Sequence, residues 1–99
     1  MWILHSADPE FGPITFRVFP GAIKTVGRAP RADFILDAAL VSRLHCRLEA
    51  GEELLEVIDL ESTNGIYVND KRVDRARLKT GDRLRIGRVE LTIDRALNA

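Results

Sequence analysis

The sequence is poor in the residues that build several common kinds of site and assembly. Its 99 residues include one cysteine, two histidines and only 6% aromatic side chains. A single cysteine, Cys46, excludes an internal disulfide, so a reducing, cytoplasmic setting is expected. The opening run WILH is too short, and too closely followed by polar residues, for a signal peptide or a membrane span.

An excess of charge of one sign is also lacking. The 15 Lys and Arg side chains balance 15 Asp and Glu side chains, and neither half of the chain carries a long run of one sign. The chain therefore has no general electrostatic field that would hold a nucleic acid backbone or an anionic membrane. Neither is expected as a partner, and any anion must be bound locally.

What the sequence has instead is short alternation of apolar and polar residues. The alternating runs are WILH, ITFRVF, IKTV, FIL, LHCRLEA, ELLEVIDL, IYVN, RLRIG and VELTID, none of them long enough for a substantial helix. Segments rich in Gly, Pro, Asn or Asp separate them and indicate turns. About ten short strands predict an all-β fold, a sandwich or a closed barrel, in a single domain spanning residues 1–99. Function is expected in the loops at one end, and residues 95–99 are expected to be a frayed tail.

The segment LVSRLHCRL contains side chains that could serve in catalysis or in metal binding. Ser42, His45 and either Asp37 or Asp59 could be arranged as nucleophile, base and orienting acid. However, the serine does not lie in a G-x-S-x-G elbow, and no glycine flanks it to allow the strained turn of a hydrolase nucleophile. So small a chain also leaves little room for a substrate cleft. We therefore predict that the protein is not an enzyme.

A metal site is no better supported. His5, His45 and Cys46 do not have the spacing of zinc-ligand pairs, and neighbours on a strand point to opposite faces. Cys46 alternates with Leu44 and Leu48 on one face, which favours a small buried thiol. No metal and no cofactor are expected.

The remaining reading is the binding of an anion by converging loops. In VGRAP, Gly27 can turn the backbone sharply after a strand while the Arg28 guanidinium points outward. In SRLH, Ser42 and Arg43 supply a hydroxyl and a second guanidinium just before the next strand. Arg side chains, hydroxyls and backbone N–H groups are the donors that phosphate oxygens accept.

The segment STNG would supply a third loop, closed by an Asn-Gly turn, with the hydroxyls of Ser62 and Thr63 and the amide of Asn64. Taken one at a time, each of these features also has a simpler explanation. Arg28 reads equally well as a solvated surface charge, and Ser42 as a residue of the turn that leads into a strand.

The order and spacing of the segments carry more information than any one of them. VGRAPRADFIL, VSRLHCRL, VIDLESTNGIYVNDKRV and LKTGDRLRIG follow one another along the chain. This order, with Gly-Arg, Ser-x-x-His and Ser-Thr-Asn-Gly, resembles the forkhead-associated (FHA) domain family from about residue 25 to 93. The resemblance implies an eleven-strand β-sandwich of two sheets, FHA/SMAD-like, with recognition loops at one end. It implies binding of phosphothreonine peptides, not of DNA.

The resemblance also assigns roles residue by residue. It implies that Arg28 and Ser42 bond the phosphate, that Thr63 contacts the phosphothreonine and that Asn64 bonds the peptide main chain. Arg43 occupies a position that varies in the family, and a phosphate contact is expected there.

Three further matches have supporting roles. His45 would tie adjacent recognition loops together, while Gly27 and Gly65 would permit tight loop shapes. Asn69 also matches the family pattern, and there a structural turn residue is the expected role.

The implied function is that of a phosphothreonine-dependent adaptor in Ser/Thr kinase signalling, whose partner is a protein marked by such a kinase. The alternative is a domain of the same fold that binds a partner through a sheet face, independent of phosphate, or that serves as a structural module. The loop DAALV, with apolar Ala38, Ala39 and Leu40, further suggests an aliphatic ligand residue three positions after the phosphothreonine.

Overall fold

Eleven strands in two sheets make up the fold in the computed structural model, which describes residues 1–8 and 12–96. The predicted all-β sandwich of eleven strands is confirmed, and the closed barrel is not what forms. In chain order the strands are β1 (Trp2–Asp8), β2 (Gly12–Val18), β3 (Ile23–Gly27), β4 (Phe34–Ile35), β5 (Cys46–Ala50), β6 (Leu55–Asp59), β7 (Ile66–Val68), β8 (Lys71–Val73), β9 (Arg75–Leu78), β10 (Arg83–Ile86) and β11 (Val89–Arg95).

Each of the two sheets contains strands from both halves of the chain. One has six strands in the order β2-β1-β11-β10-β7-β8, and the other has five in the order β4-β3-β5-β6-β9. All pairings are antiparallel except that of β3 with β4. In the described residues there is no helix, and so none that could cross a membrane.

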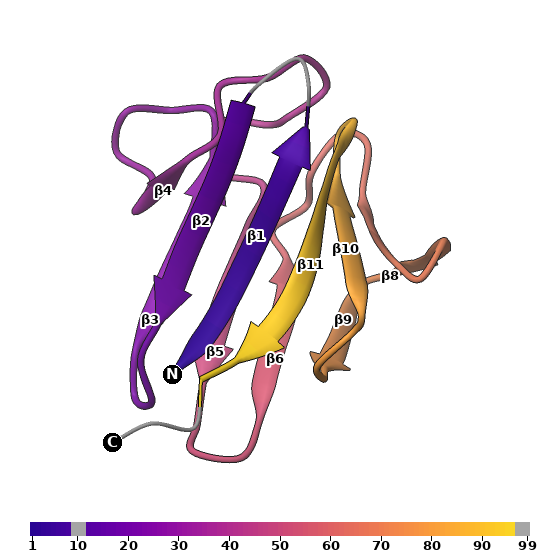
Figure 1. The fold of residues 1–99 in the computed structure, drawn as a ribbon. Helices are drawn as coiled ribbons and strands as arrows, with labels where there is room; N and C mark the ends of the chain where they lie inside the picture. The colour runs from indigo at the N-terminus through magenta and orange to yellow at the C-terminus, as the bar shows by residue number, and fades with distance from the viewer. Residues whose placement is uncertain (9–11, 97–99) are drawn as a thin grey trace.

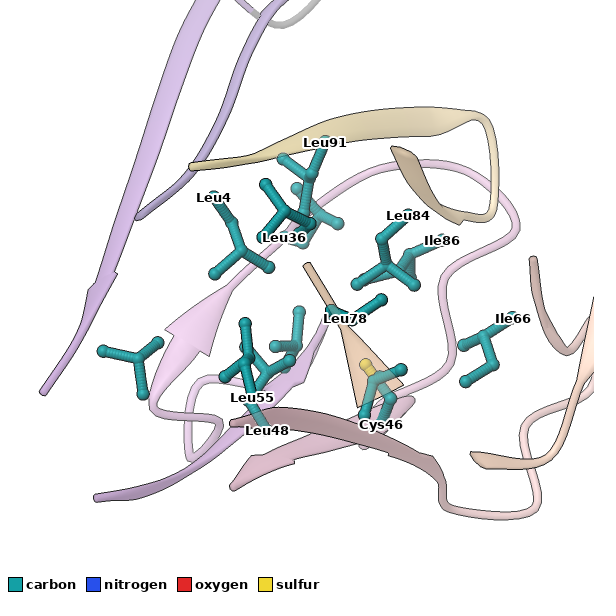
Figure 2. Packing of buried hydrophobic residues seen from close by; sticks show 14 of the residues in the cluster. Leu4, Leu36, Cys46, Leu48, Leu55, Ile66, Leu78, Leu84, Ile86 and Leu91 are labelled. Atoms are coloured by element: carbon teal, nitrogen blue, oxygen red, sulfur yellow. The ribbon is translucent and has the colours of Figure 1, made fainter. Parts of the chain in front are cut away.

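Alternation along the strands builds the core between the sheets. Strand β5, for example, is buried at Cys46, Leu48 and Ala50 and partly exposed at the residues between. Leu4 and Leu91 of the six-stranded sheet face Leu48 of the five-stranded sheet across the core (Figure 2). Because each apolar face is buried only against the other sheet, neither sheet is stable alone.

The start of β1 and the end of β11 lie together, at the end of the sandwich opposite β4 (Figure 1). The N–H of Ala96 donates to the carbonyl of Met1 at 2.9 Å, and Arg95 still belongs to β11. The guanidinium of Arg95 also lies over the ring of Trp2, 5.0 Å from its centroid. The tail expected to be frayed from residue 95 therefore begins later, because Arg95 is still part of the strand. Residues 97–99 of that tail lie outside the described residues.

Candidate functional site

Three loops at one end of the sandwich are joined by hydrogen bonds beyond the ends of the strands. The loop after β3 pairs with the segment before β5, because the N–H of Arg28 donates to the carbonyl of Ser42 at 2.9 Å and the N–H of Ala29 to that of Arg43 at 3.0 Å. These bonds join the two loops beyond Val26 and Cys46, the last paired residues of β3 and β5. They bring the predicted residues Arg28, Ser42 and Arg43 together.

Gly27 allows this close approach, but not by the dihedral freedom that the sequence suggested. Its φ is not in the left-handed region. A Cβ on Gly27 would instead lie 2.0 Å from the carbonyl oxygen of Arg43, a backbone atom that cannot swing aside. The glycine is therefore needed because two backbones touch here.

The guanidinium of Arg28 is oriented by one backbone acceptor. Its Nε donates to the carbonyl of Val41 at 3.1 Å. Among the described residues its two terminal NH₂ groups have no hydrogen-bond partner. Four N–H donors of this side chain therefore remain for a ligand.

His45 lies beneath the loops and holds two of them. It is fully buried, and its Nδ1 accepts the backbone N–H of Ser42 at 3.0 Å. Because that N–H can only donate, Nδ1 carries no proton, and Nε2–H donates to the carbonyl of Gly65 at 2.8 Å. The predicted tying of adjacent loops matches this geometry.

The same contacts are not those of a nucleophile with its base. The imidazole of His45 bonds the backbone of Ser42, while the Ser42 hydroxyl accepts the N–H of Thr63 at 3.1 Å. Asp59 is occupied elsewhere, accepting from the hydroxyl and the N–H of Ser62. The relay of hydrogen bonds that a catalytic triad requires is not formed by these residues.

The third loop, STNG, is held in shape from within and from the neighbouring loop. Ser62 accepts the N–H of Gly65 at 2.9 Å, and Gly65 itself has a φ of 76°. The Nδ2 of Asn64 donates to the carbonyl of Leu40 at 3.1 Å. The hydroxyl of Ser62, considered above as a candidate donor, therefore serves the turn. Its anchor is Asp59, which the sequence suggested only as a possible triad acid.

The loops enclose an open groove of about 520 Å³. Arg28, Ser42, Thr63 and Asn64 line it together with the segment from Asp37 to Val41. Arg43 lies on the far side of Arg28, in an adjoining groove. Within that segment Leu40 is 49% exposed, whereas Ala38 is buried. Of the predicted phosphate-binding residues, Arg28, Ser42 and Thr63 thus line one groove beside the loop DAALV, while Arg43 lines the adjoining one.

The other residues singled out earlier lie away from the groove. Cys46 is fully buried in the core, and burial raises the pKa of its thiol. Asn69 is a turn residue, as predicted: its side chain donates to Asp82 at 3.0 Å and accepts the N–H of Arg83 at 2.9 Å. His5 pairs with Asp94 at 3.1 Å on the outer face of the other sheet. Within residues 1–8 and 12–96, no three His, Cys, Asp or Glu side chains gather as metal ligands would.

Comparison with known proteins agrees with this arrangement. A family model described as FHA domain matches residues 24–87. The glycogen accumulation regulator GarA of Mycolicibacterium smegmatis is 46% identical over 69 residues, which cover 68% of this chain and 42% of GarA. The chain spans less than half the length of the curated relatives it matches most strongly.

Solved structures extend the likeness to nearly the whole chain. An FHA domain from a study of phosphothreonine-dependent FHA domain interactions has a TM-score of 0.84 and 29% identity, covering 97% of this chain and 98% of that one. Mycobacterium tuberculosis EmbR, solved in complex with a low-affinity phosphopeptide, has a TM-score of 0.77 and 31% identity, covering 93% of this chain and 24% of EmbR.

Proposed function

Because the chain belongs to the forkhead-associated (FHA) domain family, we propose that it binds phosphothreonine-containing segments of partner proteins and acts as a non-catalytic adaptor in Ser/Thr kinase signalling. The observation that carries the proposal is the groove in which Arg28, Ser42 and Thr63 meet from three loops. Such convergence of donors suits a phosphate, which accepts several hydrogen bonds at once.

Each donor would have a defined task at the phosphate. Arg28 would offer its terminal NH₂ groups, since its Nε already bonds Val41. Ser42 would donate its hydroxyl proton, because its oxygen already accepts the N–H of Thr63. Thr63 and Arg43 would complete the set of donors around the phosphate, one on each side. A charge-assisted hydrogen bond contributes about 1.5 to 3 kcal/mol, and a micromolar ligand binds with about 8 kcal/mol, so two or three such donors would dominate the affinity.

Asn64 would bind the peptide main chain. Its Nδ2 is engaged by the carbonyl of Leu40, which leaves the side-chain oxygen free to accept an N–H of an extended peptide. Leu40 itself is half exposed beside this position, and an aliphatic ligand residue would pack against it. This supports a preference for an aliphatic residue three positions after the phosphothreonine.

The alternative, phosphate-independent binding through a sheet face, has less support. On the outer face of the five-stranded sheet, Arg47 pairs with Glu49 at 2.8 Å and Arg75 with Glu56 at 2.7 Å, whereas Arg77 of β9 forms no ion pair among the described residues. Charges that satisfy each other within the sheet do not call for a partner. A cytoplasmic role, where Ser/Thr kinases act, fits the single buried cysteine.

The test is fluorescence anisotropy of the purified domain with degenerate peptide pools centred on phosphothreonine, phosphoserine or unmodified threonine. We expect saturable binding of the phosphothreonine pool, no binding of the threonine pool, and at least tenfold weaker binding by Arg28→Ala. Arg17→Ala is the matched control, because Arg17 is an exposed arginine of β2 outside the groove. A folded wild-type domain that binds no pool, or binds all three equally, would contradict the proposal.

A further inference from the structure

Arg28 lies between the first groove and a second one, which is lined almost wholly by the loop after β3. Its volume is about 530 Å³, and it is lined by Arg28, Ala29, Pro30, Arg31 and Arg43. The segment from Asp37 to Val41 and residues Thr63 and Asn64 line only the first groove. A peptide bound at Arg28 therefore has two distinct surfaces beside its phosphate.

The turn that carries Arg31 is well held. The N–H of Ala32 donates to the carbonyl of Ala29 at 3.0 Å, and Pro30 occupies the turn position where its fixed φ is favoured. Ala32 is buried, which anchors the end of the turn to the domain. Arg31 is thus an exposed side chain on a well-held turn, so a ligand that binds it orders the side chain but does not have to order the loop.

The charges of this groove are not balanced within the domain. Among the described residues, Arg28, Arg31 and Arg43 form no ion pair with a carboxylate. The acidic residue nearest to Arg31 in sequence is Asp33, and its carboxylate is bound by Thr25 instead. It accepts hydrogen bonds from the N–H of Thr25 at 2.8 Å and from the Thr25 hydroxyl at 3.1 Å. These hydrogen bonds also lower the pKa of Asp33.

A phosphothreonine alone would not neutralise this groove. Its phosphate carries a charge of about −1.5 to −2 at neutral pH, against three guanidinium groups. We propose that the ligand carries a second anionic side chain, a carboxylate or another phosphate, which binds Arg31 in this groove. The proposal rests on the phosphothreonine-binding function above and extends it to the selectivity of the site.

The two grooves then differ in what they accept. Away from the phosphate donors, the first groove is lined by Asp37 and the apolar segment from Ala38 to Val41, and a ligand carboxylate beside Asp37 meets a like charge. The second offers only cations and the apolar surface of Ala29 and Pro30. An acidic residue therefore strengthens binding on one side of the phosphothreonine only.

The experiment uses alanine- and serine-based peptides that carry one phosphothreonine and a single glutamate walked through four positions on each side. Affinities are measured by anisotropy for the wild-type domain, Arg31→Gln and, as a control of equal charge change, Arg17→Gln. We expect one or two positions, all on one side, to tighten wild-type binding about two- to fivefold. This gain disappears in Arg31→Gln and persists in Arg17→Gln. Replacing that glutamate by a second phosphothreonine separates the two sources of charge, and the larger gain identifies the preferred one.

Three outcomes would overturn the inference. If wild type binds the phosphothreonine peptides but no glutamate position improves the affinity, or if the gain survives Arg31→Gln, the second anion site is wrong and the proposed function stands. If no phosphothreonine peptide binds at all, both fail together. Arg31→Glu adds a check of sign, because the favoured glutamate should then weaken binding, and lysine at the same position should strengthen it.

Discussion

The Nε2–H of His45 donates to the carbonyl of Gly65 at 2.8 Å, across 20 residues of sequence and inside the domain. The other ring nitrogen accepts the N–H of Ser42, so one imidazole fixes the positions of two loops relative to each other. A histidine three residues from a serine is in this molecule an internal brace. The groove proposed to bind the phosphate is held in shape by a residue that does not line it.

Replacing this brace should weaken both folding and binding. In His45→Ala, the carbonyl of Gly65 and the N–H of Ser42 lose their partners, which costs about 2 to 4 kcal/mol of unfolding free energy. Urea unfolding measures this loss, and anisotropy with the phosphothreonine pool measures the affinity. His5→Ala is the control: its exposed pair with Asp94 is worth about 1 kcal/mol or less. A His45→Ala domain with wild-type stability and affinity would refute the brace.

A methyl group at Gly27 should disturb the site by contact alone. The Cβ of Gly27→Ala would meet the Arg43 carbonyl oxygen 2.0 Å away, so the segment before β5 must shift. We expect a loss of about 1 to 3 kcal/mol in urea unfolding and at least tenfold weaker phosphopeptide binding. In the control Gly51→Ala, the nearest atom is the Leu54 carbonyl oxygen at 3.6 Å, and neither quantity should change much. Equal effects of the two substitutions would argue against the close approach.

The affinity for phosphothreonine should fall with pH. The second ionisation of a phosphate lies near pH 6, and the dianion makes stronger hydrogen bonds to Arg28 than the monoanion does. Binding is then strongest above pH 7 and weakens as the pH falls through about 6. Anisotropy titrations between pH 5 and 7.5 follow this change. A flat affinity over that range would show that the ligand is not bound as a dianion.

The loop after β3 should have its own dependence on acid. Hydrogen bonds from Thr25 lower the pKa of Asp33 below its ordinary value of 3.8, so the unfolded chain binds this proton more readily than the folded one. The stability that Asp33 contributes is therefore present above about pH 4 and is lost as the pH falls through the lowered value. The difference in Tm between wild type and Asp33→Ala should shrink in that window. A difference that stays constant from pH 7 to pH 2 would contradict the assignment.

Cys46 should be unreactive until the domain unfolds. It is fully buried, and desolvation raises the pKa of its thiol, so both access and thiolate are lacking. Iodoacetamide at pH 8 should leave the native protein unmodified, as judged by mass spectrometry, and should label it fully in denaturing urea. Rapid labelling of the native protein would mean that the core opens far more often than its packing suggests.

Two strands were missed in the sequence, and both lie at sheet edges. Strand β8 ends the six-stranded sheet and β9 ends the five-stranded sheet. Lys71 and Arg72 of β8, and Arg75 and Arg77 of β9, are all exposed. Each is short and buries at most one side chain fully, so it leaves a weak apolar pattern, whereas the other edge strands, β2 and β4, carry the runs ITFRVF and FIL and were predicted. The inner strands, such as β5 and β6, bury every second residue and were predictable for that reason.

The sequence by itself determined the all-β class and the candidate residues, because alternation and turn residues are local properties and the motif order is visible along the chain. Alternation alone left a sandwich and a closed barrel both open. The sequence did not determine how those residues act. The tertiary structure decided that Gly27 is required by a neighbouring backbone, and that the Ser62 hydroxyl serves its own turn whereas Ser42 lines the groove. It also decided that Arg31 and Arg43 line the same groove. Each of these depends on contacts that arise only when β3 and β5 are paired or a loop has closed. The chemistry of a loop residue follows from the hydrogen bonds that its neighbours leave unmade.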